Sequence, residues 1–150
     1  MGVIKADWAR YPGLFLLALW VGGIFFFSIG VAPVAFRIMP SQQAGEMVRG
    51  SLGVLHGLGL ICGAAFLFHS LLRGSAQRLA QGLVLSMMLL TAISQWVVTP
   101  RIEELRRSRG VQSARFSRLH RASTSLEAGV LLMGFLAMWQ VATAAKSPEE

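Results

Sequence analysis

Four long apolar runs alternate with short polar segments along this chain, at residues 11–36, 50–72, 79–99 and 122–145. About 20 consecutive apolar residues suffice for a helix to cross the hydrocarbon core of a bilayer, and only helices or closed barrels can span it. The pattern therefore predicts an all-α integral membrane protein in which residues 1–150 form one transmembrane four-helix bundle.

The segments between the runs predict how the helices are joined. Residues 73–78 form a tight turn, so the second and third helices should be antiparallel neighbours. Pro33 and Pro100 should end the first and third helices, because proline lacks a backbone N–H and clashes with the preceding turn. In the third connection, residues 101–121, we expect the third and fourth helices to project beyond the bilayer, or a short helix to lie on its surface.

The charge and composition fit a chain whose main solvent is lipid. Hydrophobic residues make up 54% of the chain and charged residues 14%, against about 25% charged in soluble domains. Nine lysines and arginines flank the membrane on the side of the basic third connection and five on the other, which predicts a cytoplasmic loop 101–121 and both termini outside. We expect these cations to contact lipid headgroups rather than nucleic acid, and the candidates are Arg101, Arg106, Arg107, Arg109 and Arg115.

Small residues spaced four apart recur on every predicted helix. The second helix carries two Gly-x-x-x-Gly pairs, formed by Gly53 with Gly57 and by Gly59 with Gly63. Such pairs let helix backbones approach closely inside a membrane, where the hydrophobic effect does not drive helices together. They predict close packing within the bundle, and they also leave faces for a membrane-protein partner or a second copy.

Polar groups inside the apolar runs mark a candidate site. Glu127 is the only one of the 21 charged residues (14 Lys and Arg, 7 Asp and Glu) within a run, and ionisable groups at membrane depth are usually functional. His120 lies seven residues earlier, about 20° short of two helical turns, and Ser123 and Thr124 follow nearly the same stripe. This predicts an intramembrane polar cluster that handles protons or cations. Alternatively, Glu127 is protonated or paired with a neighbouring helix and simply holds the bundle together.

Histidines on membrane helices also raise haem as a ligand. His56 and His69 are 13 residues apart, but an ideal helix turns their side chains about 140° away from each other. A single haem b between His56 and His120 remains as an alternative, because both histidines lie towards the same side of the membrane. The sequence contains no CxxC, HExxH, Walker or GxSxG motif, so we expect no enzyme activity and, haem aside, no cofactor.

Two segments resemble the transmembrane protein 205-like family, which overlaps a bacterial domain of unknown function. The first comprises WVGGIFFF at residues 20–27, APVAF at 32–36 and AG at 44–45; the second comprises PRIEEL at 100–105 and FSRLHRAS at 116–123. The resemblance covers most of the chain and implies four helices, a charged third connection and a bacterial inner membrane.

The resemblance implies less about activity than about fold. Members of that family typically carry asparagine where this chain has Glu127, and a eukaryotic relative is linked to resistance to platinum drugs. We therefore predict a small polytopic protein without catalytic chemistry, acting as an accessory or scaffolding subunit of a membrane complex or in transport and resistance. The alternatives are a haem-binding electron-transfer protein with ligands His56 and His120, and a proton- or cation-handling protein that uses Glu127.

Overall fold

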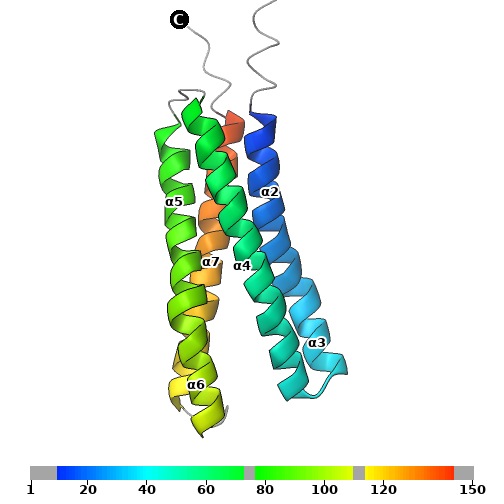
Figure 1. The fold of residues 1–150 in the computed structure, drawn as a ribbon. Coiled ribbons are helices and arrows are strands. Elements are labelled where there is room, and N and C mark those ends of the chain that lie inside the picture. The colour runs from blue at the N-terminus through cyan, green and yellow to red at the C-terminus, as the bar shows by residue number, and fades with distance from the viewer. Residues whose placement is uncertain (1–9, 73–76, 110–113, 144–150) are drawn as a thin grey trace, which may run out of the picture.

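The protein is an all-α bundle whose four helices are each long and apolar enough to cross a membrane (Figure 1). The computed structural model describes residues 10–72, 77–109 and 114–143, without the side chains of residues 106–109. Two of the four helices are interrupted by a π-helical segment. The elements are α2 (Tyr11–Phe26), η1 (Phe27–Val31), α3 (Ala32–Ile38), α4 (Ser41–Leu72), α5 (Arg78–Ile93), η2 (Ser94–Val98), α6 (Thr99–Arg109) and α7 (Ala114–Thr143).

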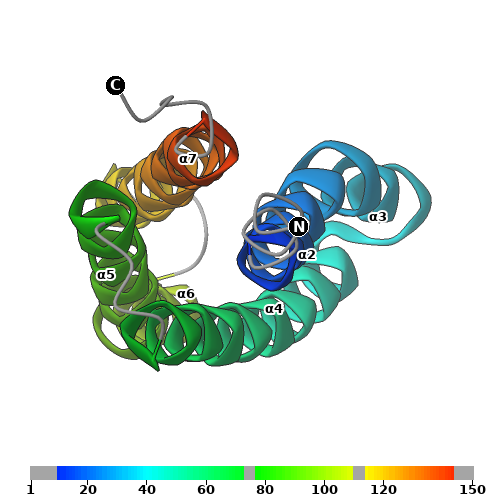
Figure 2. The same ribbon diagram turned by 90° about the horizontal axis from the view of Figure 1, so that it is seen from above.

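The four helices run up and down and surround a narrow core. Viewed from above, they follow one another around the bundle in the order α7, α5, α4 and α2, and α2 contacts α7 again (Figure 2). Helices α4 and α7 therefore lie diagonally opposite each other. The continuation of the first helix, α3, leans away from α7 and packs on α4 alone (Figure 1).

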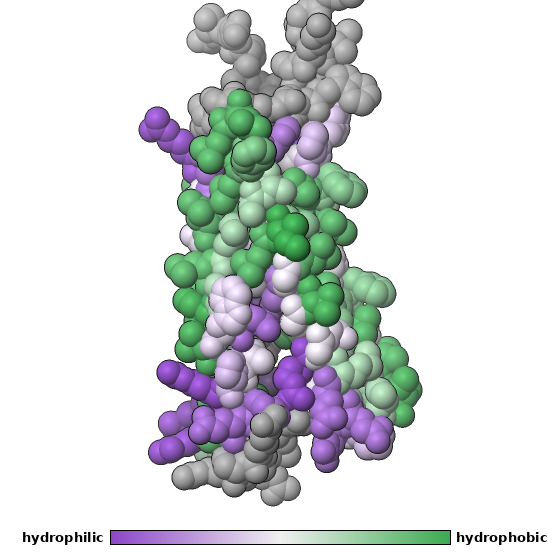
Figure 3. Space-filling model, viewed as in Figure 1, coloured by the Kyte–Doolittle hydropathy of each residue, from purple (hydrophilic) through white to green (hydrophobic). Residues whose placement is uncertain are grey.

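Each helix turns only one stripe of side chains into the core. The largest fully buried side chains include Leu17, Trp20, Phe66 and Met87. Large apolar side chains also cover the outer faces, with exposed fractions such as 67% for Phe26. A helix that is apolar all round suits a bundle solvated by lipid, and a broad apolar belt above a hydrophilic base is visible in Figure 3.

Two helices begin well before the predicted boundaries. Helix α4 starts at Ser41, nine residues ahead of the predicted start at 50, and α7 starts at Ala114, eight residues ahead of 122. An apolar run marks only the part of a helix that lies in hydrocarbon, whereas the backbone stays helical where polar turns project into the headgroup region. The third helix likewise continues through α6 to Arg109, in agreement with one of the two expectations for residues 101–121.

The predicted helix ends at Pro33 and Pro100 are wrong. Each proline is instead preceded by a π-helical segment, after which the helix continues. The N–H of Ala32 bonds to the carbonyl of Phe27, and the N–H of Thr99 bonds to the carbonyl of Ser94, five residues back in both cases. The wider turn accommodates the missing N–H and the bulk of the proline ring, so the helix does not break.

The glycines of α4 differ in what they contact. The indole of Trp20 lies across Gly59 and Gly63, where a side chain would overlap it. Gly53 faces the Gln95 side chain, while Gly57 lies on the outer face with no atom within 4 Å of where a Cβ would stand. Gly57 thus does not serve the packing role within the bundle that its spacing suggested, because its position points outward.

Gly59→Ala should destabilise the protein, because the added methyl group overlaps the Trp20 indole and overpacking costs about 1–3 kcal/mol. Gly57→Ala, two residues away, is the matched control and should be neutral or stabilising, since alanine gains up to about 1 kcal/mol of helix propensity. Unfolding in mixed micelles, followed by circular dichroism, measures both changes. Equal effects at the two positions would contradict the packing described.

Candidate functional site

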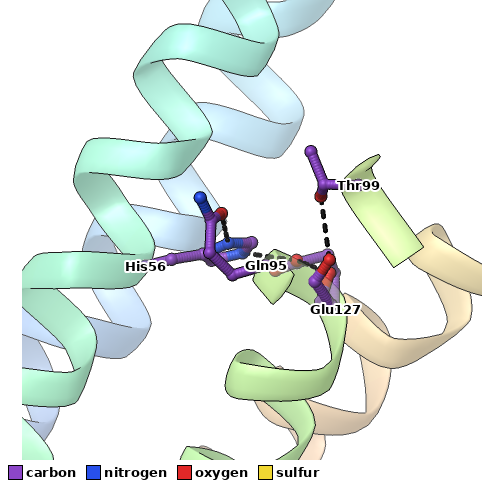
Figure 4. Close-up of polar contacts among 5 residues, drawn as sticks. His56, Gln95, Thr99 and Glu127 are labelled. Atoms are coloured by element: carbon purple, nitrogen blue, oxygen red, sulfur yellow. Dashed lines mark hydrogen bonds and ion pairs between the residues drawn. The ribbon is translucent and has the colours of Figure 1, made fainter. Parts of the chain in front are cut away.

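Four polar side chains from three helices meet near the middle of the bundle, and three of them, His56, Gln95 and Glu127, are labelled in Figure 4. His56 projects from the middle of α4, Glu127 from α7, and the consecutive residues Ser94 and Gln95 from η2. His56 Nε2 lies 2.6 Å from Glu127 Oε1, and His56 Nδ1 lies 2.9 Å from Gln95 Oε1. The Ser94 hydroxyl donates to Glu127 Oε1 over 3.4 Å. We call these four residues the polar cluster.

The position of η2 explains why two consecutive residues reach two different helices. The third helix lies between α4 and α7, so Gln95 can turn towards α4 while Ser94 turns towards α7 (Figure 2). Consecutive residues of a helix point about 100° apart, and here both belong to the π-helical segment before Pro100, a kind of segment that is frequent at functional sites. The Thr99 hydroxyl donates to the Ser94 carbonyl over 2.8 Å and secures the widened turn.

The polar cluster can hold one shared proton in two arrangements. With Gln95 Oε1 accepting from Nδ1–H, the proton between His56 Nε2 and Glu127 Oε1 can reside on either group. The pair is then either an imidazolium with a carboxylate or a neutral imidazole with a carboxylic acid. His56 is 1% exposed and the Glu127 side chain 13% exposed, so little water competes for these bonds.

Polar groups connect the cluster to the basic end of the bundle. Arg49 lies seven residues before His56 on α4, hence on nearly the same face about two turns away, and it forms an ion pair with Glu103 of α6. Thr99 lies midway between Gln95 and Glu103 along the third helix. In Figure 3, hydrophilic surface rises from the base of the molecule into the apolar belt.

The opposite direction is closed by apolar packing. Leu17, Phe66, Val84 and Met87 belong to one buried cluster beyond the polar cluster. The bond from Gln81 Nε2 to Ser70 Oγ, 2.7 Å long, joins α5 to α4 near the other end of the bundle. Among the described residues, the ion pair nearest to the polar cluster, Arg49 with Glu103, therefore lies towards the basic end.

The predicted stripe on α7 is split by the structure. Glu127 enters the polar cluster, but His120 is exposed and stacks on Phe116, with ring centroids 6.1 Å apart. The exposed Thr124 hydroxyl bonds to the carbonyl of His120 in its own helix, over 3.0 Å, and Ser123 is half-buried. Sharing one helical face with Glu127 does not bring His120 and Thr124 into the polar cluster. The end of α7 that carries them lies beside α6, at the edge of the bundle.

A haem between His56 and His120 does not fit these residues. Both ring nitrogens of His56 are engaged, one by Gln95 and one by Glu127, so none is free to ligate iron, and His120 lies exposed outside the cluster. In the described part of the chain, no three His, Cys, Asp or Glu side chains gather as a metal site.

The basic residues predicted to contact headgroups lie at the polar end of the bundle. Arg101 and Arg115 are exposed there, on α6 and α7. The side chains of the other three candidates, Arg106, Arg107 and Arg109, lie outside the described residues, although their backbone is part of α6.

Sequence reasoning did not place Ser94 and Gln95 in the site, although one signal for Gln95 was present. His56 lies 17 residues before position 73 and Gln95 lies 17 residues after position 78, so the tight turn predicted there would put them opposite each other, although residues 73–76 lie outside the described part of the chain. No comparable signal places Ser94 beside Glu127, because the longer third connection leaves the register of the fourth helix open.

Comparison with known proteins identifies relatives but no activity. The profile of a family described as "Domain of unknown function (DUF4149)" matches residues 15–111, which include His56, Ser94 and Gln95 but not Glu127. An "Uncharacterized protein" of Aquifex aeolicus (strain VF5) is 30% identical over 120 residues, which cover 80% of this chain and 86% of the relative. No solved structure matches the chain.

A double-mutant cycle measures the bond between His56 and Glu127. His56→Phe and Glu127→Gln should each lower the free energy of unfolding: the first leaves the buried carboxyl group of Glu127 without its partner, at a typical cost of about 1–3 kcal/mol, and the second replaces a bond between two ionisable groups with a weaker bond to a neutral amide. The double variant should lose less than the sum, with a coupling energy above about 0.5 kcal/mol. His120→Phe is the matched control, and its cycle with Glu127→Gln should be additive. A zero coupling energy for the His56 cycle would refute the contact.

Proposed function

The chain belongs to the DUF4149 family, and from that premise we propose that it is a proton-handling integral membrane protein, with His56 and Glu127 as the proton-binding pair. The observation that carries the proposal is the 2.6 Å contact between these two ionisable side chains inside a bundle of apolar helices. Ionisable groups at membrane depth are costly and typically mark ion pathways or proton relays.

The pair suits proton exchange because its net charge changes by one unit with each proton. With one shared proton the pair is neutral overall, in either arrangement. A second proton produces an imidazolium beside a carboxylic acid, with a net charge of +1. Loss of the shared proton leaves a neutral imidazole beside a carboxylate, with a net charge of −1. Gln95 and Ser94 offer hydrogen bonds to the pair while its protonation changes.

The proton exchanges with the basic end of the bundle in this proposal. Thr99 and the Arg49–Glu103 ion pair lie on that side, whereas Leu17, Phe66 and Met87 close the other. In the orientation predicted from the arginine bias, the basic end faces the cytoplasm of a bacterium and the protein resides in the inner membrane.

Proton binding on one side of a membrane is the first half of a transport cycle, in agreement with the resemblance to the transmembrane protein 205-like family. Four helices leave little room for a self-contained carrier of the paired-repeat type, so transport requires that copies of this chain associate, as they can in liposomes. The proposal assigns the chain no bond-making catalysis and no bound cofactor.

A second candidate, the accessory or scaffolding subunit, is favoured by the glycines on the outer faces. Around Gly22 of α2 and Gly82 of α5, no atom lies within 4 Å of where a Cβ would stand, so these faces can accept another helix at close range. Gly22→Leu and Gly82→Leu should leave the fold intact but release the protein from a complex in mild detergent. Native electrophoresis checks this, and migration that neither variant changes would remove the candidate.

Glu127→Gln and His56→Gln should abolish proton movement by the purified protein reconstituted into liposomes. A pH gradient is imposed together with a membrane potential, and a dye enclosed in the liposomes reports the internal pH. Glu46→Gln and His120→Gln are the matched controls, since both positions are exposed and lie outside the polar cluster, and they should retain the wild-type rate.

Two results would overturn the proposal. One is a proton flux in the wild type that is no greater than in empty liposomes, under either sign of the potential. The other is a flux that survives in both Glu127→Gln and His56→Gln. Folding of each variant is verified by circular dichroism before its flux is interpreted.

A further inference from the structure

Three buried polar atoms close to the polar cluster have no hydrogen-bond partner among the described residues. They are Trp20 Nε1, Thr91 Oγ1 and Glu127 Oε2, one from each of the helices α2, α5 and α7. Trp20 and Thr91 are each 1% exposed. Buried polar atoms in folded proteins are nearly always paired, with protein or with ordered water, so three such atoms in one region call for a shared partner.

The contacts between helices place these atoms at similar depth. His56 opposite Gln95 and Gly63 opposite Met88 set the antiparallel register of α4 and α5, which brings Thr91 level with Gly59. Trp20 Nε1 also lies against Gly59, three residues beyond His56 on α4. Thr91 shares the buried stripe of α5 and η2 with Ser94, which contacts Glu127. All three atoms therefore lie within about one helical turn of each other along the bundle axis.

The chemistry of the three atoms selects the ligand. Trp20 Nε1–H only donates, an ionised Glu127 Oε2 only accepts, and the Thr91 hydroxyl does either. Water both accepts and donates, and a buried water typically makes two to four hydrogen bonds to such groups. A metal cation or an ammonium ion cannot accept the indole N–H. An apolar ligand would leave all three atoms unpaired.

We propose that Trp20, Thr91 and Glu127 bind an internal water molecule beside His56. The water accepts from Trp20 Nε1–H, donates to Glu127 Oε2 and bonds to the Thr91 hydroxyl. Gly59 leaves the space that the Trp20 indole occupies. Any side chain at this position would displace the indole and remove its N–H donor from the water site.

The site extends the polar cluster one turn further from the basic end. If the pair handles protons, as proposed above, the water is the deepest group that can relay one, and the apolar layer of Phe66, Val84 and Met87 lies beyond it. This consequence rests on the proposed function. The water site does not, since it follows from hydrogen bonding alone.

Thr91→Val tests the site through the sign of its effect on thermal unfolding. Valine keeps the shape of threonine and removes the hydroxyl. If the hydroxyl bonds to water, its loss leaves the water with one partner fewer, and the melting temperature should fall. If the hydroxyl has no partner, its removal relieves a desolvation cost and the melting temperature should rise. Thr143→Val is the control for loss of a hydroxyl that bonds within its own helix, to the carbonyl of Trp139.

A structure at a resolution that shows ordered water completes the test. We expect density within hydrogen-bond distance of Trp20 Nε1 and Thr91 Oγ1 in the wild type, and its loss in Thr91→Val. A rise in melting temperature for Thr91→Val, or a wild-type structure in which the Thr91 hydroxyl bonds to the Met87 carbonyl instead, overturns the proposal. Liposomes without proton flux would refute the proposed function while leaving this density in place, so the two failures are distinguishable.

Discussion

The hydrogen bond between His56 and Glu127 joins two helices that are diagonally opposite in the bundle. Within the buried hydrophobic core, neighbouring helices meet through apolar side chains and glycines, contacts that lipid tails can imitate. A polar group at this depth has no such substitute, because lipid offers it no hydrogen bond. The bond therefore constrains how α4, α7 and the intervening η2 are arranged. One turn away, the Trp20 indole packs against Gly59 and brings α2 close to α4.

The two π-helical segments separate an apolar half of the bundle from a polar half. In the apolar half the helices pack closely, with Gly59, Gly63 and Gly134 at their tightest approaches. In the polar half the first helix leans outward as α3 and the third continues as α6 beside α7. The polar cluster lies where these halves meet, which puts ionisable groups next to hydrophilic surface without opening the core.

The fold could be predicted from the sequence because an apolar run long enough to cross the hydrocarbon core of a bilayer indicates a transmembrane helix. The helix ends could not, since the first turns of α4 and α7 are polar and the prolines at 33 and 100 lie after widened turns that the apolar pattern does not show. Glu127 was identifiable as the one charge within a run. Its partner was not, because the face of a helix says nothing about which residue of a diagonal helix stands opposite.

The family profile covers only the first three helices of the bundle, at residues 15–111. His56, Ser94 and Gln95 lie inside that part, and the carboxylate that completes the cluster lies outside it. An amide side chain in place of Glu127 would still bond to His56 but would carry no charge. In this chain, the part matched by the profile thus provides the histidine and the amide, and α7, outside it, provides the carboxylate.

Each π-helical segment contains one residue more than a continuous α-helix would need. Removing that residue would let each helix continue as an ordinary α-helix, with the turns beyond it close to their present orientation. In the third helix, Glu103 would still face Arg49, but Ser94 and Gln95, which lie inside the segment, would turn away from their present partners. A single-residue gap at 94–98 in an alignment of relatives therefore has a structural meaning: it marks a protein that shares both halves of the bundle but aims this part of the polar cluster differently.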